Sequence, residues 1–95
     1  MKDTPDRELE SCRAEIGVID REIVALLRRR VDMGLKTKSL KQELGVPILD
    51  PTREAAVIRS AVESAREAGL PAEPVREIFW RILSLSRTAQ QSEEK

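Results

Sequence analysis

Residues 9–40, LESCRAEIGVIDREIVALLRRRVDMGLKTKSL, carry a seven-residue rhythm that decides the fold class. Two columns of positions recur every seven residues, as they do along a helix that pairs with another helix. The columns are Leu9, Ile16, Ile23, Arg30 and Thr37, and Cys12, Ile19, Leu26, Met33 and Leu40. The rhythm predicts one long helix that begins near Asp6 and ends around residues 45–47, because Gly45 and Pro47 end helices.

The remainder of the chain predicts two shorter helices. One runs from Pro51 to about Ala68 with Gly69 as its C-cap, and the other begins between Pro71 and Pro74. We expect the first to bury Ala55, Ile58, Ala61, Val62 and Ala65, and the second to carry Val75, Ile78, Phe79, Ile82, Ser86 and Ala89 along one face. We interpret residues 1–95 as a single all-α domain with frayed tails at residues 1–6 and 92–95.

The composition excludes several classes of protein. Charged residues make up 36% and aromatic residues 2% of the chain, and the formal net charge is zero. Binding to a nucleic-acid backbone needs an excess of basic charge, and crossing a membrane needs a run of about eighteen apolar residues. The sequence has neither, so we expect neither nucleic acid nor a membrane as a partner. With one cysteine and no histidine, we expect no metal site. No apolar segment resembles a signal peptide, so we expect a cytoplasmic protein.

The long helix is too long for a compact single chain. About 35 residues at 1.5 Å per residue span about 50 Å, whereas a globule of this size is about 30 Å across. One chain cannot bury such a stripe by itself. The sequence therefore predicts an intertwined helical homodimer, in which two chains pair along their long helices.

Cationic side chains interrupt the apolar face of the long helix. Arg30 occupies a column that begins with Leu9, and a core-facing arginine needs a partner. Lys41, eleven residues on, returns to within about 20° of the same direction, so the two cations could hold a small anion. Arg13 lies about 25 Å from Arg30 on a straight helix and could reach such a site only from the partner chain. Two solvated surface charges remain an equally good interpretation.

Further polar residues gather at the starts and ends of the shorter helices. Asp50 before Pro51 suits a helix start, and Arg53 and Glu54 in the first turn are either part of that start or aimed at a ligand. On the last helix the step from Ile78 to Ile82 continues to Ser86 and Gln90, so the buried face turns polar. Inward hydroxyl and amide groups need partners. Together these groups would form a binding site for a small polyanion that also carries a hydroxyl or amine.

The motifs that carry a family resemblance follow one another in a specific order and spacing. They are R-x6-D at Arg13 and Asp20, LLRRR ending at Arg30, Lys41, the segment GVPILDPTRE at residues 45–54, and S-x3-Q at Ser86 and Gln90. In this arrangement, from about residue 9 to 91, the sequence closely resembles the small all-helical chorismate mutases, the AroQ class.

The resemblance implies an intertwined dimer that converts chorismate to prephenate without a cofactor. Arg13 of the partner chain and Arg30 would pair with the two substrate carboxylates, and Lys41 and Gln90 would hydrogen-bond the ether oxygen. Asp50 and Glu54 would bind near the ring hydroxyl, while Arg53 and Ser86 would complete the carboxylate and side-wall contacts. The catalytic candidates are Lys41, Gln90, Arg30 and Glu54.

Three other functions stay open. A mutase of 4-amino-4-deoxychorismate is one, because a carboxylate at Glu54 suits an ammonium at least as well as a hydroxyl. An isochorismate pyruvate lyase is less favoured, since that family lacks carboxylates at the positions of Asp50 and Glu54. The third is a non-catalytic dimerisation module in which the charged residues only form salt bridges. No regulatory domain is recognisable in the sequence, so feedback control would have to come from another protein or be absent.

Overall fold

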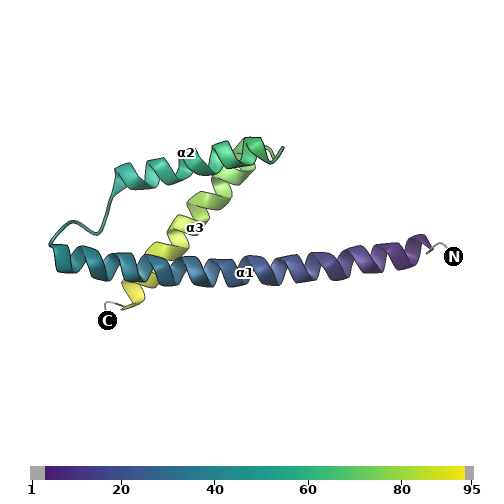
Figure 1. The fold of residues 1–95 in the computed structure, drawn as a ribbon, viewed down its shortest axis with the longest axis horizontal. Helices are drawn as coiled ribbons and strands as arrows, with labels where there is room; N and C mark the ends of the chain where they lie inside the picture. The colour runs from purple at the N-terminus through teal and green to yellow at the C-terminus, as the bar shows by residue number, and fades with distance from the viewer. Residues whose placement is uncertain (1–3, 94–95) are drawn as a thin grey trace. The chain divides into compact units, whose positions relative to one another are not determined.

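The computed structural model describes residues 4–93, and every regular element in that range is a helix. The helices are α1 (Pro5–Leu44), α2 (Pro51–Glu67) and α3 (Ala72–Glu93), which follow one another along the chain in Figure 1. The predicted all-α fold with one long and two shorter helices is confirmed. The chain divides into an N-terminal unit, Met1–Arg30, and a C-terminal unit, Val31–Lys95.

Local sequence sets where each helix begins. Thr4 caps α1, since its hydroxyl accepts the backbone N–H of Arg7 at 3.3 Å. Asp50 caps α2 in the same way through Arg53 N at 3.0 Å, and Pro51 fills the first position, where no N–H is needed. Helices α1 and α3 include residues 5–6 and 92–93, which we had expected in the tails; the other expected tail residues, 1–3 and 94–95, lie outside the described range.

Two glycines end α1 and α2 by the same hydrogen-bonded turn. Gly45 and Gly69 have φ angles of 70° and 73°, in the left-handed region that glycine adopts without strain. After α2, the N–H of Gly69 reaches the carbonyl of Arg66 at 3.1 Å and that of Leu70 reaches Ala65 at 2.8 Å. This pair of bonds is the Schellman motif, and the bonds around Gly45 repeat it.

The N-terminal unit holds the first part of α1, and its apolar side chains are exposed. Ile16 and Ile23 of the heptad pattern are 55% and 49% exposed. The same holds for Leu9, Val18, Ile19, Val24 and Leu26. The predicted stripe therefore exists on the helix, but the single chain leaves it uncovered.

In the C-terminal unit α2 packs along α3 around a small apolar core. The predicted core residues Ile58, Ala61, Val62 and Ala65 are buried, and Leu83 joins them. The prediction was wrong for Ala55, which is exposed, and for Ile78, which is 56% exposed. The buried face of α3 is centred near Leu83 and half-buried Phe79, and Ile78 lies about 100° around the helix from Phe79.

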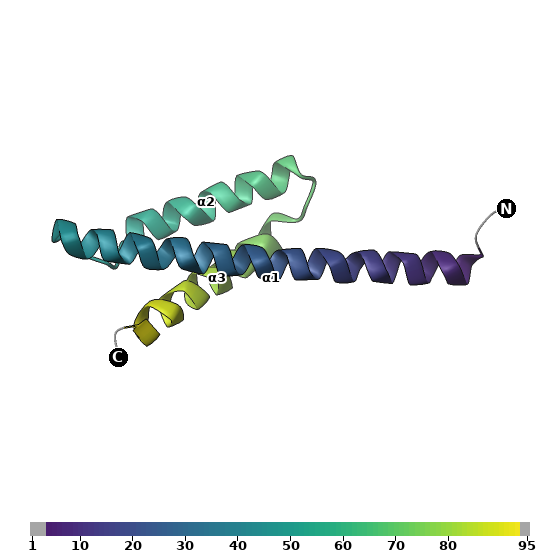
Figure 2. The same cartoon turned by 60° about the horizontal axis from the view of Figure 1, so that its bottom comes forward.

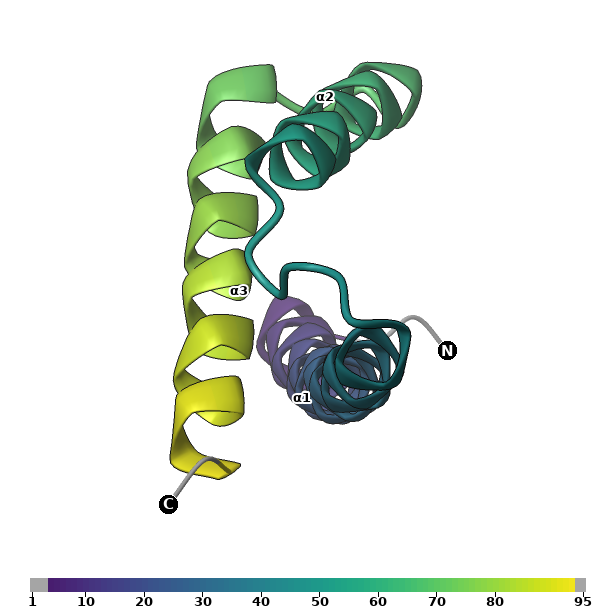
Figure 3. The same cartoon turned by 90° about the vertical axis from the view of Figure 1, so that its left-hand side faces the viewer.

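The last turns of α1 cross the C-terminal half of α3, a crossing that Figures 2 and 3 show from two sides. Val31 and Lys38 are buried on the crossing face, while Met33 and Leu40 of the heptad pattern are exposed. In this unit, α1 therefore uses a different face from the one that the heptad pattern marks. Position 38 on that face is a buried cation.

Candidate active site

A hollow of about 320 Å³ lies in the C-terminal unit, where the segment between α1 and α2 meets the last turns of α3. The connecting segment contributes Ile48 and Leu49, and the first turn of α2 contributes Glu54. Helix α3 adds Arg87, Gln90 and Gln91. The Asp50 cap and Pro51 fix where α2 begins, so they also fix the position of Glu54 at the rim of the hollow.

An ion pair across the hollow joins α2 to α3. Arg87 Nε donates to Glu54 Oε2 at 3.0 Å, and its Nη2 donates to the other carboxylate oxygen, Oε1. This is the two-pronged geometry in which a guanidinium holds a carboxylate most firmly. The Glu54 side chain is 21% exposed and that of Arg87 is 46% exposed, so the carboxylate lies deeper than its partner.

Gln90 is held to α1 from both of its polar ends. Its side-chain Nε2 donates to the carbonyl of Gly34 at 3.2 Å, and its own backbone carbonyl accepts from Lys38 Nζ at 2.7 Å. An amide nitrogen carries two hydrogens, so a second N–H of Gln90 is left for a ligand in the hollow. The two bonds fix this amide at the wall of the hollow.

Lys41 does not line the hollow, but it is hydrogen-bonded to a residue that does. Its side chain is half-buried, and Nζ donates to the backbone carbonyl of Ile48 at 3.0 Å. Ile48 lines the hollow, so this bond ties the ammonium group to one residue of the lining. A lysine ammonium has three hydrogens, so Lys41 can hold the connecting segment and still donate to a ligand.

The other candidates from the sequence are absent from the lining of the hollow. Asp50 and Arg53 are exposed and outside the lining of the hollow, and Asp50 uses Oδ1 for the helix cap. Its interpretation as a helix start is thereby confirmed. Ser86 is half-buried on α3. Arg13, exposed, and Arg30, half-buried, belong to the N-terminal unit.

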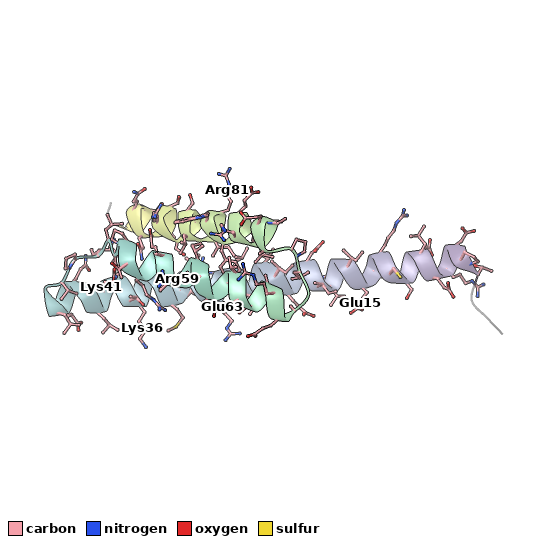
Figure 4. All side chains as sticks on the ribbon, turned by 90° about the horizontal axis from the view of Figure 1, so that it is seen from above. Glu15, Lys36, Lys41, Arg59, Glu63 and Arg81 are labelled. Carbon is pink, nitrogen blue, oxygen red and sulfur yellow. The ribbon has the colours of Figure 1, made fainter. Side chains whose placement is uncertain are left out.

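Two residues of this region were missed in the sequence. Lys38 is 5% exposed, and it follows Val31 by seven residues and precedes Lys41 by three, a spacing that marks one helix face. Arg87 precedes Gln90 by three and Gln91 by four residues, which also puts it on their side of α3. By contrast, the labelled side chains of Lys36 and Arg81 project away from the ribbon in Figure 4, and both are exposed.

Between residues 4 and 93 no three histidine, cysteine, aspartate or glutamate side chains come together in a group that could hold a metal ion. In the same range no helix combines the length and the apolar character that crossing a membrane requires.

Helices α2 and α3 and the segment before α2 place a carboxylate, a guanidinium and amides around one hollow in a small all-α protein. Residues 12–91 match the family described as chorismate mutase type II. The chain therefore belongs to the chorismate mutase type II family, an isomerase family.

Individual relatives share between 28% and 34% of aligned residues with this chain, and they carry two different names. The chain is 28% identical over 83 residues to a T-protein of Enterobacter agglomerans, covering 87% of this chain and 22% of the relative. It is 29% identical over 75 residues to the T-protein of Haemophilus influenzae, covering 79% and 20%. A 4-amino-4-deoxychorismate mutase of Streptomyces venezuelae is 34% identical over 67 residues, covering 70% of this chain and 65% of the relative. The chain thus spans about a fifth of the T-proteins that it matches.

Proposed function

We propose that this protein converts chorismate to prephenate by a cofactor-independent [3,3] rearrangement. Membership of the chorismate mutase type II family supports the reaction class. The observation that carries the proposal is the hollow that both Glu54 and Gln90 line, with the ammonium of Lys41 hydrogen-bonded to Ile48 of the same lining. In this proposal, residues 1–95 act as one catalytic domain.

The reaction needs positioning and charge stabilisation more than covalent help. As the ether C–O bond breaks and the new C–C bond forms within the same molecule, negative charge grows on the ether oxygen, and no proton or electron is exchanged. Lys41 and the second N–H of Gln90 are the donors that meet this oxygen. Fixed donors in a water-poor site favour such a transition state because they need no rearrangement as the charge develops.

Carboxylate recognition falls to the arginines. Arg30 of the same chain and Arg13 of the partner chain pair with the two carboxylates of the substrate, with Arg53 and Ser86 completing the wall. Asp50 and Glu54 bind on the side of the ring hydroxyl. The exposed apolar side chains on residues 9–26 of α1 support the homodimer that this arrangement requires, since uncovered stripes of this kind mark protein interfaces.

A second candidate substrate is 4-amino-4-deoxychorismate. One relative carries the name of the mutase of this compound at 34% identity, and Glu54 offers a carboxylate to which an ammonium could bind. The two substrates differ in the ring substituent that would lie near Glu54, so the choice between them concerns this part of the site.

The test is the loss of ultraviolet absorbance of chorismate, with 4-amino-4-deoxychorismate assayed alongside. We expect wild-type protein to consume chorismate, and Lys41→Ala to lower kcat by about a hundred- to thousandfold, because one preorganised donor to the developing charge is lost. Lys36→Ala is the matched control, since Lys36 is an exposed lysine of the same helix. Consumption of neither compound by the wild type would favour a non-catalytic dimerisation module, whereas full activity of Lys41→Ala would contradict the role proposed for Lys41.

A further inference from the structure

We propose that Arg87 is a specificity-determining residue: by holding the carboxylate of Glu54, it makes the site prefer a ring hydroxyl over a ring ammonium. The inference rests on the proposed function, because it concerns which of two related substrates that same site selects. Arg87 belongs to none of the motifs that carry the family resemblance.

The contact is built across the fold and is not a local helix pair. Glu54 and Arg87 are 33 residues apart in sequence and come from α2 and α3. Both line the same hollow, so the pair is part of the surface that a ligand would touch. Two hydrogen bonds from one guanidinium, one to each carboxylate oxygen, fix the orientation of Glu54 and pair its negative charge with a positive one.

A paired carboxylate distinguishes between the two substituents. Each oxygen of Glu54 accepts one hydrogen bond from Arg87 and keeps a further lone pair, so the carboxylate can still accept a hydrogen bond from a neutral hydroxyl. An ammonium binds a carboxylate mainly through opposite charge. Next to Glu54 it would also meet the positive guanidinium of Arg87, and a like charge at this distance offsets the attraction.

Removal of the guanidinium charge should therefore reverse part of the preference. The readout is the ratio of kcat/KM for 4-amino-4-deoxychorismate to that for chorismate, measured at low ionic strength. We expect Arg87→Gln to raise this ratio about tenfold or more, the size of effect that one nearby charge has in a partly exposed site. Arg87→Met, which keeps the stem of the side chain without its charge, should raise the ratio likewise if the glutamine variant folds poorly.

Three comparisons separate charge from structure. Arg87→Lys retains a cation, so the ratio should remain close to that of the wild type. Arg81→Gln removes an exposed arginine of the same helix and should leave the ratio unchanged. In the double variant Arg87→Gln with Glu54→Gln, the gain should disappear, because the carboxylate that attracts the ammonium is gone.

Two outcomes overturn the inference while leaving the proposed function intact. In the first, the wild type is active on chorismate, but Arg87→Gln and Arg87→Met have the same ratio of the two kcat/KM values as the wild type. In the second, Arg81→Gln changes this ratio by as much as Arg87→Gln does. A wild type that neither converts nor binds either compound, with binding measured by calorimetry, overturns the proposed function and the inference together.

Discussion

At the scale of single residues, the unexpected feature is a buried lysine next to the site. Lys38 is 5% exposed, yet its ammonium has a clear role, because Nζ donates to the backbone carbonyl of Gln90 at 2.7 Å. This bond joins α1 to the last turn of α3, which ends at Glu93. Lys38 therefore ties α1 to α3 at Gln90, a residue that lines the hollow.

Substitution of Lys38 should consequently affect stability. We expect Lys38→Met to lower the free energy of unfolding by about 1.5–3 kcal/mol, the range for hydrogen bonds from charged groups, because the bond between Lys38 and the carbonyl of Gln90 is lost. Urea unfolding at one fixed protein concentration measures the change, with Lys36→Met as the exposed control on the same helix. If both variants unfold at the same urea concentration as the wild type, this account of Lys38 is wrong.

At the scale of elements, α1 carries two different faces. Up to Arg30 its heptad side chains are exposed, whereas in the C-terminal unit the buried positions are Val31 and Lys38. A 40-residue helix with an uncovered apolar stripe over its first turns loses favourable burial unless another surface covers it. A second copy of the same helix is the partner that the sequence predicts.

A lysine in this stripe should therefore prevent pairing. We expect the wild type to sediment as a dimer at micromolar concentration and Ile16→Lys to weaken the dimer by about 3 kcal/mol or more, since a charge would be buried without a partner. Glu15→Lys is the neighbouring control, because Glu15 lies outside both heptad columns and its side chain is exposed. A monomeric wild type would remove the basis for the dimer, and a fully dimeric Ile16→Lys would move the interface elsewhere.

At the scale of the whole molecule, the proposed site draws on two chains. Arg13 precedes Arg30 by 17 residues, about 25 Å along one helix, so the two cannot hold one small substrate from the same chain. In a two-fold symmetric dimer each site would instead take Arg30 from one chain and Arg13 from the other.

Mixed dimers test this sharing directly. Arg13→Ala and Arg30→Ala proteins should each lose activity, whereas subunit exchange between them should restore about a quarter of the wild-type value. Half of the dimers would then be mixed, and each mixed dimer has one intact site, since both substitutions fall in the other site. Chorismate consumption measures the recovery, and a mixture that remains as inactive as its parents would mean that Arg13 does not act across the dimer.

The sequence alone determined the helices and their boundaries. The apolar periodicity, the caps at Asp50 and Pro51, and the glycines at positions 45 and 69 act on neighbouring residues, so they can be recognised without knowledge of the fold. For the same reason the buried face of α2 was predicted well, and Glu54 and Gln90 were recognised as candidates before their common hollow was known.

Only the tertiary structure decided which polar groups meet. The contacts between Arg87 and Glu54, and between Lys38 and Gln90, join residues 33 and 52 positions apart. Helix periodicity fixes the direction of a side chain about its own axis, but not which neighbouring helix it meets or at which height. The exposure of Ile78 has the same cause, because the face of α3 that is buried depends on how α2 packs against it.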